Sequence, residues 1–102
     1  YHSDDTLGYT EKFIYHPNGT IKEIVYDEPK RKFFTTTRFN EQGEVIEIIN
    51  KRDNKQRSHI IYKYPEHDEY GNWTRREKYK IKEGKEVLLD IEIREFEYYQ
   101  EL

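Results

Sequence analysis

One turn pattern occurs three times along this chain. In residues 15–21, 39–45 and 67–73, a ring-bearing residue stands four positions before a glycine, and a large apolar residue stands two positions after it. The three glycines are 24 and 28 residues apart, which is close to the length of two strands and two turns. A repeat of this kind predicts a β-sheet built from successive hairpins.

The chemistry of these turns favours a bulged hairpin loop of three residues. A short polar side chain, such as that of Asn40 or Asp68, accepts backbone N–H groups at the start of a type I turn, and the glycine then takes a left-handed conformation. In that register the ring-bearing residue faces the apolar residue on the next strand, and each pair contributes roughly 0.2–1 kcal/mol. The expected pairs are Tyr15–Ile21, Phe39–Val45 and His67–Trp73. The residues expected to shape the turns are Gly19, Gly43, Asp68, Gly71 and Gly84.

Composition supports strands, although the apolar content is low. Apolar residues make up 33% and charged residues 38%, a balance that approaches that of disordered chains. The apolar residues include sixteen aromatics, eleven Ile and three Val, with no Ala and no Met. These side chains fit a pleated surface better than a helix, and Tyr can cover a sheet face while its hydroxyl stays hydrated. The composition therefore predicts a thin sheet with a tyrosine-rich face.

We expect an all-β fold, an antiparallel up-and-down meander of about seven strands that forms a single curved sheet or a partly open barrel. The length suits a single domain over residues 1–102, with residues 1–8 disordered or peripheral. Residues 51–56 are expected to form a polar loop, and residues 65–71 the longest connection. The expected strands span residues 9–15, 20–26, 32–39, 44–50, 57–64, 72–82 and 85–99.

The charges of the last two expected strands predict their register. From Trp73 to Lys85 the chain carries six basic and two acidic residues, and after Lys85 it carries six acidic residues and one basic residue. Adjacent strands of opposite charge attract, and register is strongly set where one face of a sheet is buried. We therefore expect a three-residue loop at residues 82–84. The pairs that this loop predicts are Lys80–Glu86, Arg76–Asp90, Thr74–Glu92, Tyr79–Val87 and Trp73–Ile93.

Residues 62–64 and 68–76 resemble the Tyr-Asp repeat of YD/RHS-like proteins, whose pattern runs aromatic-x-Tyr-Asp-x-x-Gly-Asn. The segment resembles in particular the short variants found in uncharacterised bacterial cell-envelope proteins, where Gly-Asn-Trp followed by basic residues is common. The resemblance covers residues 60–99, within which residues 94–98 resemble a closing strand, and covers residues 9–50 only in degenerate form.

The resemblance implies a β-sheet repeat, often exported to the periplasm or the cell surface, with a structural, encapsulating or interaction role and no catalytic residues to transfer. This chain departs from the pattern where His67 stands in place of the Tyr, and where His16 and Asn40 stand in place of the Asp. A sequence that begins with Tyr1 rather than Met fits a removed signal peptide and equally a trimmed start, with an upstream lipid-anchored Cys as a further alternative.

The aromatic residues are the candidate interaction surface. Those expected on one side of the sheet are Tyr9, Phe13, Tyr15, Phe39, Tyr62, Tyr64, Trp73 and Tyr79. Six of them, Tyr15, Phe39, Tyr62, Tyr64, Trp73 and Tyr79, are the candidate residues for binding a protein partner or a glycan, with a role in the core as the alternative. Because a single-layer sheet cannot bury both faces, we expect dimerisation, strand addition at an edge, or curling to cover one of them.

No catalytic, cofactor or metal site is predicted. The chain has no Cys, and its two serines, Ser3 and Ser58, lie in no recognisable nucleophile motif. His67 with its neighbours Asp68 and Glu69 is interpreted as a solvated turn, because consecutive residues rarely point at one metal ion. No apolar run approaches the ~18 residues that a membrane-spanning helix needs.

Charge disfavours a nucleic-acid partner. The net charge is −3, and the basic stripe of the sixth expected strand is expected to face an acidic neighbour and to lie on the face opposite to Trp73 and Tyr79. The stripe consists of Arg76, Lys78, Lys80 and Lys82. Together these features predict a non-enzymatic β-repeat module with a scaffold or protein-interaction role in a bacterial cell envelope. A ligand- or glycan-binding module is the alternative, and a nucleic-acid-binding sheet is the lower one.

Overall fold

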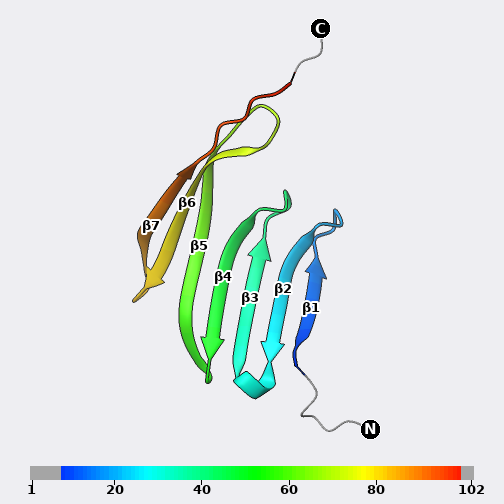
Figure 1. The fold of residues 1–102 in the computed structure, drawn as a ribbon, viewed down its shortest axis with the longest axis vertical. Coiled ribbons are helices and arrows are strands. Elements are labelled where there is room, and N and C mark those ends of the chain that lie inside the picture. The colour runs from blue at the N-terminus through cyan, green and yellow to red at the C-terminus, as the bar shows by residue number, and fades with distance from the viewer. Residues whose placement is uncertain (1–7, 100–102) are drawn as a thin grey trace.

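A computed structural model describes residues 8–99. The expectation that residues 1–8 are disordered or peripheral concerns residues that, apart from Gly8, lie outside this range. The described residues form one antiparallel sheet of seven strands in sequence order, and the sheet does not close into a barrel (Figure 1). The predicted all-β meander is therefore confirmed in its open form. The strands are β1 (Thr10–Tyr15), β2 (Ile21–Glu28), β3 (Phe33–Phe39), β4 (Val45–Arg52), β5 (Lys55–His67), β6 (Trp73–Lys82) and β7 (Lys85–Ile93), with one short 3-10 turn, η2 (Pro29–Arg31), between β2 and β3.

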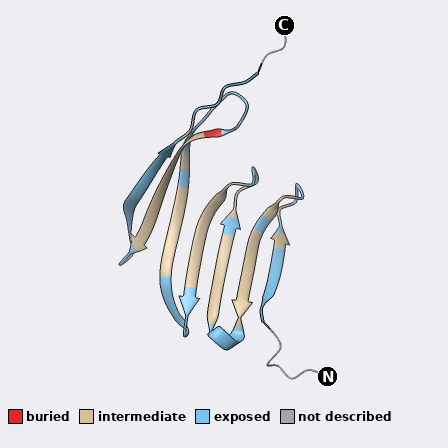
Figure 2. Cartoon of the chain, viewed as in Figure 1, coloured by how far each residue is buried: buried red, intermediate tan, exposed pale blue. Residues whose placement is uncertain are grey.

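The sheet is a single extended layer. Its radius of gyration is 17.8 Å, whereas a compact domain of 100 residues has about 13 Å. Among the described residues Trp73 is the one buried side chain, with 9% of its surface exposed (Figure 2). The described part of the fold therefore has no conventional core, and each strand is held mainly by its neighbours in the sheet, two for β2 to β6 and one for the edge strands β1 and β7.

The three glycine turns adopt the predicted geometry. Gly19, Gly43 and Gly71 have φ values of 91°, 86° and 87°, in the left-handed region where an L side chain is strained. Each glycine N–H donates to the carbonyl three residues earlier, at 2.9 to 3.1 Å. The cross-strand pairs Tyr15–Ile21, Phe39–Val45 and His67–Trp73 are all present, so the predicted register of these hairpins is confirmed.

Asn40 and Asp68 cap their turns as expected. Asn40 Oδ1 accepts the backbone N–H groups of Gln42 at 3.1 Å and Glu44 at 2.9 Å, and Asp68 Oδ1 likewise accepts two backbone N–H groups two and four residues later. His16 cannot cap its turn in this way. Its Nε2 instead donates to the carbonyl of Phe39 at 2.9 Å, which joins the first turn to the second.

The turns at the opposite end of the sheet are tighter than predicted. Residues 51–56 do not form a polar loop, because β4 and β5 continue to a two-residue turn at Asp53 and Asn54, with φ values of 54° and 63°. Two left-handed residues make the type of turn whose twist matches the twist of the flanking strands. Asn and Asp tolerate this conformation better than other non-glycine residues.

The predicted three-residue loop between β6 and β7 is wrong. The loop has two residues, Glu83 and Gly84, with φ values of 52° and 77°, and it pairs Tyr79 with Leu88. A bulge at Leu89 then shifts the register. The predicted pairs are replaced by Lys80–Val87, Lys78–Asp90, Arg76–Glu92 and Arg75–Ile93. The shorter loop moves the oppositely charged residues of β6 and β7 out of register, and the bulge brings such residues opposite one another again.

The boundaries of β5 and β7 also differ from the prediction. β5 continues through Pro65 to His67, with irregular pairing between Lys63 and His67, and Pro is tolerated at such a bulge because no ladder hydrogen bond is needed there. β7 ends at Ile93 rather than at residue 99. The backbone N–H of Arg94 still donates to the carbonyl of Thr74 at 2.8 Å, so the next residues stay close to β6.

Trp73 is the packing centre of the C-terminal half. Its ring centroid lies 5.9 Å from that of Tyr64, and the guanidinium carbons of Arg76 and Arg94 lie 4.9 and 3.4 Å from it. Arg94 also donates two hydrogen bonds to the Trp73 carbonyl, at 3.2 and 3.0 Å. Cations over an indole face are favourable, and Trp is the best acceptor of this kind.

We expect Trp73→Ala to lower the free energy of unfolding by about 3 kcal/mol, the lower end of the range for large aromatic truncations, because the ring packs against a few side chains of a single layer and not inside a closed core. Urea denaturation followed by circular dichroism measures the change. Tyr99→Ala is the control, since Tyr99 is 92% exposed and should change stability by no more than about 0.5 kcal/mol. Equal effects of the two substitutions would contradict a central role for Trp73.

Candidate functional site

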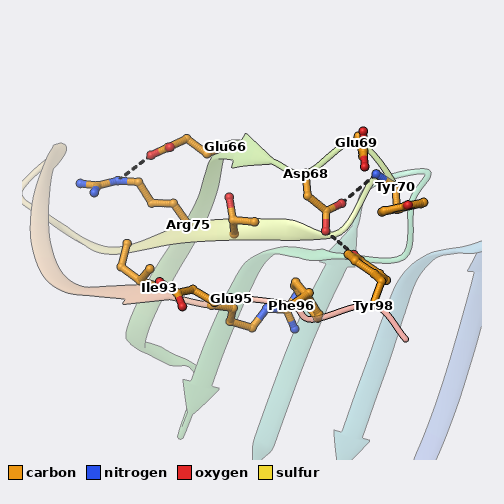
Figure 3. A pocket seen from close by; sticks show the side chains of 11 residues that line it. Glu66, Asp68, Glu69, Tyr70, Arg75, Ile93, Glu95, Phe96 and Tyr98 are labelled. Carbon is orange, nitrogen blue, oxygen red and sulfur yellow. Dashed lines mark hydrogen bonds and ion pairs between the residues drawn. The ribbon is translucent and has the colours of Figure 1, made fainter. Parts of the chain in front are cut away.

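A hollow lies between the β5–β6 turn and the segment of residues 94–98 (Figure 3). Its volume is about 740 Å³. Its lining combines carboxylates, guanidinium groups and aromatic rings. These side chains are Glu66, Asp68, Glu69, Glu95, Arg75, Arg94, Tyr70, Phe96 and Tyr98.

Tyr98 fastens the C-terminal segment to the third glycine turn. Its hydroxyl donates to Asp68 Oδ2 (Figure 3) and accepts from Asn72 Nδ2 at 2.9 Å. The ring centroid of Tyr98 lies 4.2 Å from that of Tyr70, at the tip of the turn. Arg94, whose guanidinium lies between Trp73 and Phe96, anchors the other end of the segment.

Hydrogen bonding keeps Asp68 ionised. The pKa of its carboxyl is lowered, chiefly because the Tyr98 hydroxyl donates to it, with help from the backbone N–H groups of Asn72 and Tyr70. The same bond raises the pKa of the Tyr98 hydroxyl. An ionised acceptor with three hydrogen-bond donors is suited to holding a turn in place and poorly suited to proton transfer near neutral pH.

A second cluster of ionisable groups lies across the middle of the sheet. Arg38 donates to Glu23 at 2.8 Å and to Glu47 at 2.7 Å, and His59 Nε2 lies 2.6 Å from Glu47 Oε2. Although partial burial raises the pKa of Glu47, the hydrogen bonds from His59 and Arg38 bring it below its ordinary value. Glu23, Arg38 and Glu47 are direct cross-strand partners, and no described hollow is lined by them. The cluster therefore acts as a lateral brace between strands.

The candidate aromatic residues do not form one surface. Tyr62, Tyr64 and Trp73 gather around Arg76, whose guanidinium carbon lies 4.8 Å from the ring centroid of Tyr62. Tyr79 lies on the other face, because it is directly opposite Ile61, the sequence neighbour of Tyr62. Tyr15 and Phe39 lie apart from this group, at the ends of the first two glycine hairpins.

The expectation that Trp73 points away from the basic side chains of β6 is wrong. The ring contacts Arg76, because Glu66 and His67 pair with Arg75 and Trp73, which leaves Thr74 as an extra residue of β6 and interrupts the alternation of that strand. The predicted charge compensation of this stripe is present in part. Arg76 forms an ion pair with Glu92, and Lys78 lies opposite Asp90.

Sequence reasoning did not single out the exposed edge of the sheet. All nine residues of β7 are exposed, and its large apolar side chains are 41–59% exposed. These side chains are Val87, Leu88, Leu89, Ile91 and Ile93. The N–H of Ile91 bonds to the carboxylate of Asp90 at 3.0 Å and so points away from the ladder. The run of three apolar residues from Val87 to Leu89 is the feature of the sequence that could have identified this edge.

Within residues 8–99, no three His, Cys, Asp or Glu side chains lie together in a way that could hold a metal ion. The described residues also contain no helix with the length and apolar character to cross a membrane. Comparisons with protein-family models, with curated proteins and with solved structures find no match to this chain.

Tyr98→Phe removes the hydroxyl that donates to Asp68, so we expect the pKa of Asp68 to rise toward its ordinary value. Because the pKa of Asp68 is lowered in the folded state, its contribution to stability is present above the ordinary pKa and is lost as the pH falls through the folded value. An NMR titration of the Asp68 carboxyl measures the change. Tyr99→Phe is the matched control, and an unchanged titration in Tyr98→Phe would exclude the proposed bond.

Proposed function

We propose that this chain is a non-enzymatic β-repeat module that serves as a scaffold in a bacterial cell envelope and binds a partner protein by adding a strand at the β7 edge. The observation that carries the proposal is the nine-residue edge β7, which is exposed along its whole length and carries five large apolar side chains. An open edge presents unpaired backbone groups that a further strand can use, and alternate side chains then give specificity.

The chemistry of β7 describes the partner. Glu86, Asp90 and Glu92 stand among its apolar side chains, so the added strand should be basic and apolar. The basic strand β6 pairs with β7 on its other side and has this composition. A second copy that paired through its own β7 would place acidic residues near acidic residues, which opposes association.

The proposed location in a cell envelope rests on the resemblance of residues 60–99 to YD/RHS-like repeats. The geometry of the third glycine turn supports that comparison in one respect. Asp68 caps the turn and Gly71 takes the left-handed position, and these are the Asp and Gly of the repeat pattern.

A labelled peptide with the sequence of Trp73–Lys82 tests the edge. We expect it to bind the protein, and we expect Ile91→Pro to weaken binding at least tenfold, because proline removes the N–H that points away from the ladder. Fluorescence anisotropy measures the affinity, and hydrogen exchange locates the protected amides.

Two controls give the experiment its specificity. Phe13→Ser changes an exposed aromatic residue on the opposite edge, β1, and should leave peptide binding unchanged. Light scattering on the protein alone should give a monomer mass. Equal peptide binding by Ile91→Pro would rule out the β7 edge, and a dimer abolished by that substitution would identify the added strand as that of a second copy.

A ligand- or glycan-binding role is the second candidate, and the hollow beside the third glycine turn favours it. Tyr70, Phe96 and Tyr98 are exposed there beside carboxylates, and such rings and acceptors suit the faces and hydroxyls of sugars. The basic stripe of β6, by comparison, lies against acidic residues of β7, which gives a nucleic-acid-binding sheet less support.

An N-acetylglucosamine hexamer, titrated against intrinsic fluorescence, tests the glycan role. If the hollow binds the sugar, Tyr70→Ala should weaken binding about tenfold, because one stacking ring is lost. Tyr9→Ala, which truncates an exposed ring on the N-terminal side of the sheet, should have no effect. Saturable binding that survives Tyr70→Ala would place the sugar elsewhere.

A further inference from the structure

The two ends of the sheet carry opposite charge. The hairpin topology brings residues 27–33, 51–57 and 80–86 to one end, which we call the basic rim, and the three glycine turns to the other, which we call the glycine rim (Figure 1). The basic rim holds ten Lys and Arg against five Asp and Glu, a formal charge of +5. The glycine rim, counted over residues 15–21, 39–45 and 66–73, holds five Asp and Glu and no Lys or Arg.

Few ion pairs neutralise the basic rim. Arg31 lies 3.6 Å from Glu28 and Arg57 lies 4.0 Å from Asp53, and exposed pairs of this kind contribute little. The acidic Glu86 is engaged by Lys63, outside the rim, at 2.7 Å. The rim lysines for which the described residues provide no ion pair include Lys32, Lys51, Lys55, Lys80, Lys82 and Lys85.

The rims act independently because of their separation. Strands of seven or eight residues, such as β2, β3 and β4, separate them by roughly 23–27 Å. The Debye length at physiological ionic strength is about 8 Å. A charged surface close to the basic rim therefore interacts with +5 rather than with the net charge of −3 of the whole chain.

The shape and the aromatic contacts of the basic rim indicate its partner. Its three turns follow one another along one margin of the sheet, with the β6–β7 turn set off from the other two by the twist of the sheet (Figure 1), and such an extended row of cations suits an extended anionic surface. Phe33, an aromatic residue of the rim, has its ring centroid 5.8 Å from the guanidinium carbon of Arg52 and 6.0 Å from the ring centroid of Tyr26, so its ring is already engaged by two neighbours and is a poor platform for stacked bases. The glycine rim of a second copy has the right charge, but the margin of a single layer is narrow beside the roughly 800 Å² per partner of a stable interface.

We propose that the basic rim docks this protein on an anionic phospholipid surface, with the strands upright and the glycine rim directed away from the lipid. Phosphate headgroups attract Lys and Arg, each near-surface cation strengthening binding by a factor of about five. The anionic lipid surface also repels the acidic glycine rim, and this repulsion keeps the glycine rim directed away from the lipid. This contact uses neither the hollow nor the apolar side chains of β7, and it shares with β7 only the first two residues of that strand, Lys85 and Glu86, so it does not depend on the proposed function.

Vesicle co-sedimentation tests the proposal, with vesicles of phosphatidylcholine alone or of equal parts phosphatidylcholine and phosphatidylglycerol. The protein should bind the anionic vesicles at about 0.15 M salt, release them near 1 M salt, and ignore the neutral ones. Neutralising one lysine in each turn with Lys32→Gln, Lys55→Gln and Lys85→Gln should lower the partition coefficient about a hundredfold, at a factor of about five per lysine.

The matched control is Lys12→Gln, Lys22→Gln and Lys78→Gln, which removes the same charge from positions outside the basic rim and should retain wild-type binding. Circular dichroism of both triple variants verifies that they fold. Binding to neutral vesicles, or equal losses in the two triple variants, would overturn the proposal. Single-stranded oligothymidine is the competitor, and its displacement of the vesicles at equal phosphate concentration would assign the rim to nucleic acid instead.

Discussion

Backbone hydrogen bonds between neighbouring strands provide most of the cohesion of this sheet, because Trp73 is the one buried side chain in its described part. A ladder of this kind has no core to correct its register, so the turns must set it. The left-handed glycines and the caps formed by Asn40 and Asp68 do so at one end. The two-residue turns after β4 and β6 and the η2 turn after β2 do so at the other. The rims, the open edge and the hollow all follow from that register.

Local turn chemistry made much of this fold predictable. The three glycine hairpins could be read from Asn, Asp and Gly at fixed offsets, and the meander followed from their spacing. The two-residue turns were missed because Asp53 and Glu83 adopt positive φ without being glycine. The bulge at Leu89 was missed because it depends on how strand twist and cross-strand charge are balanced, and no single residue signals that balance.

The candidate surfaces were harder to predict than the strands. An alternating pattern assigns faces only while the ladder is regular, and the extra residue Thr74 in β6 turns Trp73 toward Arg76. The attachment of residues 94–98 to the third turn joins groups about 30 positions apart, such as Asp68 and Tyr98. The charge of the basic rim arises from three distant segments that only the topology brings together. The β7 edge meets the basic rim at Lys85 and Glu86 and the hollow at Ile93, whereas the hollow and the basic rim lie at opposite ends of the sheet.

The described chain enters the sheet at one rim and leaves it at the other. β1 begins at the basic rim, and residues 94–99 follow β7 out at the glycine rim (Figure 1). Tension between these two points runs along the strands, and antiparallel hydrogen bonds lie perpendicular to the strands. A pulling force would therefore shear whole rows of bonds together instead of opening them one at a time. Although its described part has almost no core, the sheet is therefore expected to resist a pulling force along its strands.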